Sequence, residues 1–412
     1  MSVIKPPSAA EHHHDRAGRE PAVIQGDVIV LFLLIGVCIW IWHAAFRKAP
    51  ELEAPRGFMQ RQLDACPFTI RQINKTTYLI RELDRFVSLA TLSRVYHHLH
   101  PQDENPHVYV KKHTQILPDG RSATLLIVND TGCGTSASSK LSRTGQWNIR
   151  TFIDHHLNPS SSIPYLVILS HCHYDHILGL NPILRPAHMT HSTRTQIVSS
   201  AHDPSFISPA NLRKHSLCGE LGLRLPPYQT GVWAAHHQSL EVVHPKLGAT
   251  MALPITTLHT PGHTPDSLSW YDAEERALYV GDAFYEAPAP ILFPSEGDLK
   301  QWWDSVDMLV AFVRGQNAEQ NANIAQSRVT LSAGHVTAGV DALRCLLEVK
   351  EFMRRVLRNG VHFEEEPMKR GERFGSWREE GGRFCLGAPL RLVEEGRKAI
   401  PVNDWMESVE LV

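Results

Sequence analysis

Apolar residues recur at every second position in several short segments, a period that predicts β-strands with one buried face. Two of these segments, 108–116 and 123–128, flank Pro118-Asp119-Gly120, a turn signal typical of hairpins. A further segment, 165–169, is apolar throughout and predicts a buried strand. The early segments are 68–73, 76–80, 108–116 and 123–128.

Other segments carry a helical pattern, at 86–98, 147–157, 298–314 and 343–357. The segment at 298–314 is amphipathic, and core packing alone would explain its apolar face. That face contains Trp302, Trp303, Val306, Leu309, Val310 and Val313. Residues 191–241 are rich in Ser, Pro and Gly and show little periodicity. We expect them to form either the wall of a substrate pocket or a surface excursion.

Residues 28–46 contain no Asp, Glu, Lys or Arg. As a helix, this stretch is about long enough to cross a hydrocarbon core of ~30 Å. Trp40 and Trp42 suit the membrane interface, and Arg47 and Lys48 close the stretch. The apolar stretch is longer than the core of a cleavable signal peptide. The sequence therefore predicts an uncleaved transmembrane helix, with a buried core helix as the alternative.

The flanks of this stretch predict its surroundings and orientation. Residues 1–27 are polar and predicted to be disordered, and 47–66 read as a linker. More basic residues follow the span than precede it, which favours a single-pass protein whose following domain is cytosolic. They are Arg16 and Arg19 before it, and Arg47, Lys48, Arg56 and Arg61 after it. Seven scattered cysteines also suit a reducing compartment.

The run after the buried strand at 165–169 contains four metal-ligand side chains: His171, His173, Asp175 and His176. Imidazole nitrogens and carboxylate oxygens are ligands that zinc accepts. Four such groups cannot pack in a core without hydrogen-bonding partners. The alternative is a solvated histidine-rich loop, in a chain that contains 25 histidines.

Three more candidate ligands each come just past an apolar strand-like run. His263 follows 255–258, Asp282 follows 277–280, and His335 follows 329–331. Ligands at strand ends suit a metal site at a sheet edge, with a rigid scaffold below and open loops above. Turn-forming residues lie beside them, namely Pro261, Gly262, Gly281 and Gly334.

The motif set resembles that of the metallo-β-lactamase-fold hydrolases, in particular glyoxalase II and lactonase enzymes. The His-x-His-x-Asp-His motif lies at 171–176, and the run 125–132, which includes Asp130, looks like the family's first motif. The resemblance covers about 67–345, the expected catalytic domain, with 346–412 as an extension packed on it. It implies an α/β fold, a four-layer αββα sandwich.

The resemblance also implies how two metals would be shared among the ligands. His171, His173 and His263 would hold one metal, and Asp175, His176 and His335 the other, with Asp282 bridging both. Asp130 would orient the ligand loop from outside the ligand set. Two ions would clamp a bridging hydroxide for attack on a carbonyl or phosphoryl centre. Asp175 is also a candidate acceptor for its proton. Zinc is the expected metal, with iron or manganese as alternatives.

We therefore expect a zinc-dependent hydrolase of a small acyl substrate: a thioester, lactone or related compound. A phosphodiesterase or nuclease of the same fold is the main alternative, although a net charge of −2 argues against a nucleic-acid surface. A diiron oxidoreductase, a β-lactamase and a scaffold with a relic site are less expected. The oligomeric state is open.

Several residues beside the ligands have other expected roles. Cys172 lies between two ligands and should face away from the metals. Cys133 should pack in the core, and His259 should be structural. Tyr174 could either pack or donate to a substrate. We expect His236, His237 and His244 to be solvated.

Overall fold

The computed structural model describes residues 66–83, 105–134, 147–184, 195–320 and 328–406. All of them belong to the unit Ala65–Val412. The predicted transmembrane segment at 28–46 and the predicted helix at 86–98 lie outside the described residues. Within the described ranges, no helix is both long and apolar enough to cross a membrane.

A seven-stranded sheet carries the first ligand motif. Its strands lie in chain order from β1 to β7; the first four are antiparallel, and β4 to β7 run parallel. Because β4 and β5 are parallel, their carboxyl ends meet at one edge, which brings Asp130 close to the 171–176 motif. The strands are Phe68–Gln72 (β1), Thr77–Glu82 (β2), His107–Ile116 (β3), Ser122–Asn129 (β4), Tyr165–Ile168 (β5), Gln196–Ser200 (β6) and Val232–Ala234 (β7).

A six-stranded sheet carries the later ligands. Its order is β14-β13-β11-β10-β9-β8. Strands β11 and β13 pair in parallel, so the turns after them, which hold Asp282 and His335, share one edge. The strands are Gln238–Val243 (β8), Thr250–His259 (β9), Leu268–Asp272 (β10), Ala277–Tyr279 (β11), Thr330–Ser332 (β13) and Ala338–Asp341 (β14).

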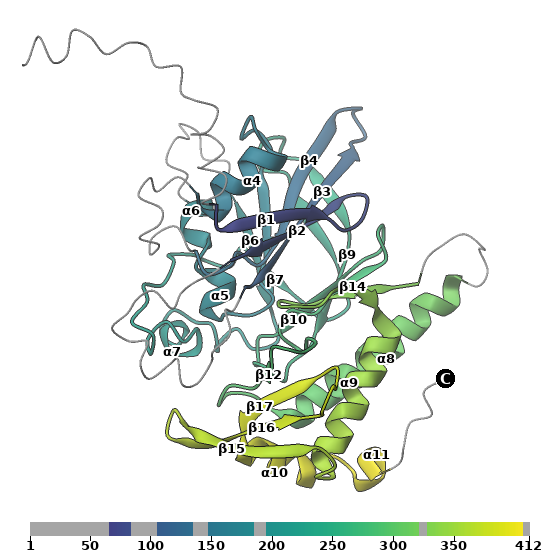
Figure 1. Cartoon of the computed structure of the whole chain (residues 1–412). Coiled ribbons are helices and arrows are strands. Elements are labelled where there is room, and N and C mark those ends of the chain that lie inside the picture. The colour runs from purple at the N-terminus through teal and green to yellow at the C-terminus, as the bar shows by residue number, and fades with distance from the viewer. Residues whose placement is uncertain (1–65, 84–104, 135–146, 185–194, 321–327, 407–412) are drawn as a thin grey trace, which may run out of the picture. The chain divides into compact units, whose positions relative to one another are not determined.

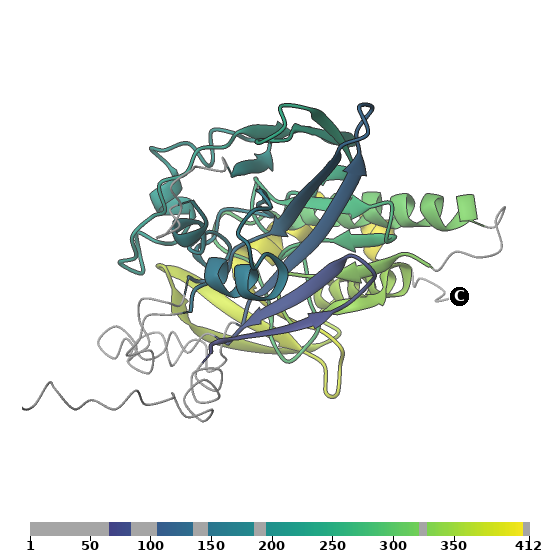
Figure 2. The ribbon, with the colours of Figure 1, turned by 90° about the horizontal axis from the view of Figure 1, so that it is seen from above.

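The two sheets face each other across a buried apolar core, and helices cover their outer faces (Figures 1 and 2). Trp270 of β10 stacks on Tyr279 of β11 in this core, with ring centroids 4.1 Å apart. Helix α4 (Ile149–Leu157) packs Phe152 on the outer face of the first sheet. Helices α8 (Leu299–Gln320) and α9 (Ala342–Leu357) cover the second sheet. The layers therefore follow the order α, β, β, α.

A third sheet, not predicted from the sequence, lies beside α8 and α9. Its order is β12-β17-β16-β15, and α10 (Leu390–Ala399) follows it. Trp377 and Leu386 from this sheet join the core cluster that contains Trp303. Strand β12 comes from the loop after Asp282, and its Leu292 pairs with Gly387 of β17. The strands are Ile291–Leu292 (β12), His362–Lys369 (β15), Glu372–Arg378 (β16) and Cys385–Pro389 (β17).

The predicted elements that lie in described residues are present with small shifts in their ends. All six apolar residues predicted on the 298–314 helix are buried in α8. The predicted domain boundary at 345 lies inside α9. The poorly periodic region 191–241 contains β6, β7, the start of β8 and a short helix, Leu212–His215 (α7).

The prediction that His244 is solvated was wrong. Only 4% of it is exposed, and its Nε2 donates to the carbonyl oxygen of Thr124. Its Nδ1 accepts backbone hydrogen bonds from Lys246 and Leu247, so the ring stabilises a tight turn after β8. His236 and His237 are exposed, as predicted.

Candidate metal centre

The first ligand motif spans the loop after β5 and a short helix, α5 (Tyr174–Ile177). His171 and His173 lie in the loop, whereas Asp175 and His176 lie in the helix, and all four are buried. Asp175 and His176 therefore point from a helical turn while the two loop histidines approach from the strand end. Because the backbone changes from loop to helix within the motif, its side chains divide between two clusters.

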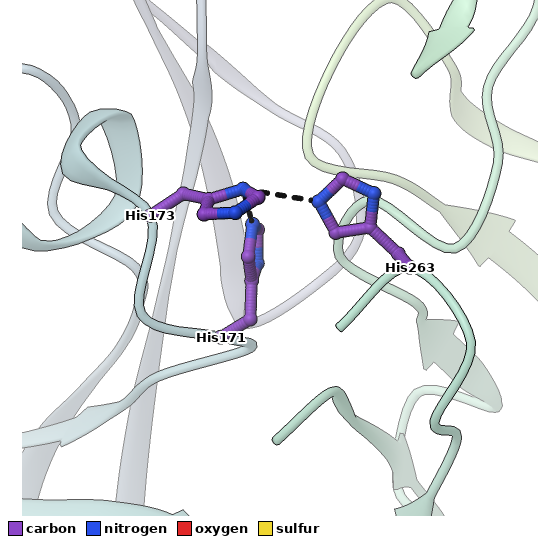
Figure 3. A group of neighbouring side chains, drawn as sticks. All are labelled: His171, His173 and His263. Atoms are coloured by element: carbon purple, nitrogen blue, oxygen red, sulfur yellow. Dashed lines mark hydrogen bonds between the residues drawn. The ribbon is translucent and has the colours of Figure 1, made fainter. Parts of the chain in front are cut away.

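Three histidines form the first cluster, named here the three-histidine cluster: His171, His173 and His263 (Figure 3). The Nδ1 atom of His173 lies 2.9 Å from His171 Nε2 and 3.1 Å from His263 Nε2. His263 comes from the turn after β9, in the second sheet. The cluster therefore joins the edges of both sheets.

Groups behind the imidazoles fix the orientation of the rings. His263 Nδ1 lies 2.7 Å from the carbonyl oxygen of Leu292, which can only accept, so Nδ1 carries the proton and Nε2 offers a lone pair. His171 Nδ1 lies 3.0 Å from Ser170 Oγ. Such partners typically fix the tautomer of a metal-binding histidine.

The three histidines favour their neutral form. Burial lowers the pKa of each imidazole, and the neighbouring imidazoles lower the pKa of His171 and His173 further. Neutral imidazoles that converge within about 3 Å present lone pairs to one another. A borderline divalent cation such as zinc would satisfy them together.

Four residues form the second cluster, named here the mixed cluster: Asp175, His176, Asp282 and His335. Asp175 Oδ2 lies 3.2 Å from both His176 Nε2 and His335 Nε2. Asp282 lies 3.4 Å from each of the same two nitrogens. Two carboxylates and two imidazoles thus surround one point at the sheet edges.

Charge in the mixed cluster is strongly coupled. Burial alone would lower the pKa of His176 and His335, but the adjacent carboxylates raise it well above the ordinary range. Burial alone would raise the pKa of Asp175 and Asp282, but the histidines lower it well below the ordinary range. The site therefore attracts positive charge.

The mixed cluster also contains buried atoms that lack hydrogen-bonding partners. His176 Nδ1 donates to Asp130, so a neutral ring leaves a lone pair on Nε2. This Nε2 and Asp282 Oδ1 have no hydrogen-bond partner, yet they face each other at 3.4 Å. A cation between the two atoms would satisfy both: either a proton on Nε2, which the raised pKa of His176 favours, or a metal ion in its place. The residues of both clusters thus fit divalent cations.

The two clusters adjoin each other. The rings of His171 and His176 have centroids 4.1 Å apart, and they belong to different clusters. All seven predicted ligands are thus brought together, in the two sets that the resemblance implies. Asp282 groups with the mixed cluster, and its bridging role stays a prediction.

Asp130 supports the ligand loop from the end of β4. Its Oδ1 accepts the backbone N–H of Ser170 at 2.8 Å, and its Oδ2 accepts His176 Nδ1–H at 3.0 Å. Asp130 has a φ of 59°, a left-handed conformation that Asp tolerates better than most residues. This backbone turn aims both carboxylate oxygens at the ligand loop.

Gly334 allows the last ligand loop to approach the mixed cluster. A Cβ atom at this position would lie 2.1 Å from Asp282 Oδ1 and 2.9 Å from His176 Cε1. Only glycine fits there without moving a ligand. The requirement for a residue without a side chain explains why Gly334 immediately precedes His335.

The neighbouring residues lie mostly as predicted. Cys172 is buried, belongs to neither cluster, and hydrogen-bonds with Asp266. Cys133 packs against Tyr174, and His259 bonds the carbonyl oxygen of Ala234. Sequence reasoning missed Ser170 and the carbonyl of Leu292 as partners of the ligands. Ser170 could have been suggested by its position before the motif.

Comparisons with known proteins identify related sequences. The sequence profile of the "Metallo-beta-lactamase superfamily" matches residues 124–314. A protein of Aspergillus versicolor named "Putative transcription factor avaE" is 29% identical over 304 residues, covering 71% of this chain and 77% of that protein.

Solved structures were also compared. A metallo-beta-lactamase from Pontibacter korlensis has 14% identity and a TM-score of 0.39, covering 67% of this chain and 94% of that one. FIM-1 from Pseudomonas aeruginosa, in a mono-zinc form, has 15% identity and a TM-score of 0.39, with 68% and 93% covered. The profile match assigns residues 124–314 to the metallo-beta-lactamase superfamily, and the seven motif residues gather at the sheet edges.

Proposed function

We propose that the protein is a dinuclear metal-dependent hydrolase that cleaves an ester-like acyl substrate, such as a thioester or a lactone. The observation that carries this proposal is the contact between the three-histidine cluster, made of neutral imidazoles, and the mixed cluster, which contains two carboxylates. Zinc is the metal we expect, because three imidazoles suit a borderline ion.

Bound divalent ions would polarise a substrate oxygen and lower the pKa of a water molecule to near neutrality. The residues of the chain would orient the ligands and accept the proton. Asp130 keeps the proton of His176 on Nδ1, and the Leu292 carbonyl does the same for His263. Burial of the ligands limits competing water, and the Asp175 carboxylate is the acceptor that we propose for a proton of the attacking water, with its Oδ2 3.2 Å from two imidazole nitrogens.

The Aspergillus relative carries a name that refers to transcription. We favour hydrolysis for this chain because its seven ligand side chains are all buried around two points, an arrangement that costs free energy unless cations occupy it. A regulatory function would not require two carboxylates and two imidazoles to face one another at 3.2–3.4 Å.

The test combines metal analysis with a hydrolysis screen on the full chain. We expect about two equivalents of metal per chain and turnover of at least one thioester or lactone. A variant with His173→Ala and Asp282→Ala should lose both the bound metal and the turnover. Turnover of phosphodiesters in place of esters would assign the phosphodiesterase alternative, and iron as the native metal would favour an oxidoreductase. Full metal occupancy without any turnover would contradict the proposal.

A further inference from the structure

A cavity lies on the first sheet beside the loop that carries His335. It has a volume of about 280 Å³ and is lined by residues of β1, β2 and β3 together with Val336. This volume suits a small chemical group better than a whole drug-sized ligand, which typically needs ~300 Å³ or more. Two of the lining residues are arginines, Arg71 and Arg81, and a third, His107, contributes an imidazole.

Strand register places these basic side chains on one face. Arg81 of β2 pairs with Thr69 of β1 on one side and with His107 of β3 on the other. Arg71 of β1 pairs with Leu79, two residues from Arg81. Side chains two residues apart on a strand share a face, so the two arginines are diagonal neighbours on that face.

The two guanidinium groups lack opposite charges. Among the described residues, neither Arg71 nor Arg81 forms an ion pair or a side-chain hydrogen bond. Like charges on neighbouring strands are destabilising. Charged residues on edge strands can deter aggregation, but Arg81 lies on β2, which is paired on both sides. Both arginines are exposed, so water screens part of their repulsion, and an anion between the two groups would offset the rest.

His107 adds a buried polar atom to the cavity wall. Only 2% of the residue is exposed, and its Nε2 has no hydrogen-bond partner. Tyr109 Oη donates to the carbonyl of Ala333 at 2.7 Å and lies 3.2 Å from His107 Nδ1, which therefore donates to it. His107 Nε2 is left as a buried acceptor without a hydrogen-bond partner among the described residues, which costs free energy beside the cavity.

The cavity lies beside the loop that carries the candidate ligand His335. Val336, which lines the cavity, follows the ligand His335 in the chain, and the backbone N–H of His107 donates to Gly334 at 2.7 Å. Val336 has a φ of 49°, a strained conformation for a β-branched residue. This strained residue lies in the loop between the mixed cluster and the two arginines.

We propose that this cavity is a substrate subsite in which Arg71 and Arg81 bind an oxyanion, a carboxylate or a phosphate, at the end of the acyl substrate remote from the scissile carbonyl. The inference rests on the proposed function and names its substrate class: acyl compounds with an anionic tail. Guanidinium groups suit this task because they bind such oxyanions through paired hydrogen bonds.

A binding experiment tests the subsite without any turnover. Calorimetry on the metal-loaded full chain would use inorganic phosphate and glutarate as probes. Replacing both arginines, Arg71→Gln with Arg81→Gln, should weaken binding about 10-fold or more, since hydrogen bonds to charged groups are worth ~1.5–3 kcal/mol each. The matched control is Arg121→Gln, on an exposed arginine at the β3–β4 hairpin. Equal affinity in the double variant and the wild type would overturn the proposal.

A kinetic experiment tests whether the arginines recognise the anionic end of a substrate. Two thioesters of equal length, one with a terminal carboxylate or phosphate and one neutral, would be compared. The double variant should raise KM for the anionic substrate about 10-fold and leave kcat, and KM for the neutral substrate, unchanged. Arg71→Lys with Arg81→Lys should restore part of the difference by keeping the charge.

The outcomes distinguish the two proposals. Phosphate and glutarate binding that depends on the arginines, without hydrolysis of any ester, would refute the proposed function and keep the anion site. Ester hydrolysis with identical KM changes for neutral and anionic substrates would refute the subsite and keep the function. Anion binding that is unaffected by the arginines would reflect the metal centre alone and would also refute the subsite.

Discussion

Asp130 and His176 are joined by a hydrogen bond of 3.0 Å between Oδ2 and Nδ1, which directs the opposite ring nitrogen of His176 at two carboxylates. Asp130 Oδ1 is occupied by the backbone N–H of Ser170. Both oxygens of this carboxylate therefore act as acceptors. The side chain holds both the ligand and the strand end that carries the ligand loop.

Replacing Asp130 with Asn should weaken metal binding without unfolding the protein. Asn keeps the shape but offers one acceptor, so its amide would face either Ser170 N–H or His176 Nδ1–H. Loss of such a partner typically costs ~10–100-fold in metal affinity or activity. Competition titration with a chelating dye would measure the affinity. An unchanged affinity would show that Asp130 has no orienting role.

Asp282→Ala should cost more metal than Cys172→Ala. The Asp282 carboxylate lies 3.4 Å from two imidazoles of the mixed cluster, whereas the Cys172 thiol hydrogen-bonds with Asp266 and belongs to neither cluster. Elemental analysis should find metal lost from the first variant and retained in the second. Equal loss in both variants would require thiolate coordination.

Gly334→Ala should disturb the mixed cluster, because the added methyl group would meet Asp282 Oδ1 at 2.1 Å. We expect reduced metal content and activity. Gly315→Ala is the matched control: it lies in α8 with no atom within 4 Å of an added Cβ. There the same change should raise the free energy of unfolding by ~0.5–1 kcal/mol. Chemical denaturation and metal analysis of both variants would check the contrast.

Lys111→Met should strongly destabilise the fold at neutral pH. Lys111 Nζ lies 2.8 Å from Asp272 Oδ2, and both side chains are fully buried. Removing the cation leaves an uncompensated buried carboxylate, a change that typically costs ~3–5 kcal/mol. Lys112→Met, on the exposed neighbouring position, should have little effect. Denaturant unfolding of the two variants would measure the difference.

The cost of Lys111→Met should depend on pH. Burial raises the pKa of Asp272 although Lys111 opposes the shift, so the variant carboxyl should have a still higher pKa. A raised carboxyl pKa means that the stability contribution is present at low pH and is lost as the pH rises through the folded value. The destabilisation should therefore shrink as the pH falls toward the ordinary value of 3.8. A constant cost over this window would contradict the account.

The grouping of the seven candidate ligands could be predicted because each one follows an apolar run that forms a strand. This placement depends on local sequence, and parallel pairing of β11 with β13 then brings Asp282 and His335 together. The carbonyl of Leu292 could not be predicted as a partner of His263, because any residue has a backbone carbonyl. The basic cavity could not be predicted either, because Arg71, Arg81 and His107 share a face only through the register of three strands.

The third sheet was missed for a different reason. Strand β15 contains Glu364, Glu365 and Glu366 in sequence, with Pro367 after them, and most of it is exposed. Such a strand shows no alternation, since pairing with β16 stabilises it and burial of one face does not. Alternation of apolar residues indicates burial of one strand face, so it does not reveal an exposed strand that is stabilised only by pairing with its neighbour.

The link from His263 through the Leu292 carbonyl to β17 has a consequence for the order of biosynthesis. Strand β12 is held in place by pairing with residues 385–389, which leave the ribosome long after every metal ligand has been made. Folding during synthesis proceeds from the N-terminus. The acceptor that fixes His263 is therefore in position only when β17 has been translated. We therefore expect a nascent chain that already displays all seven candidate ligands, but not yet residues 385–389, to bind metal more weakly than the finished protein.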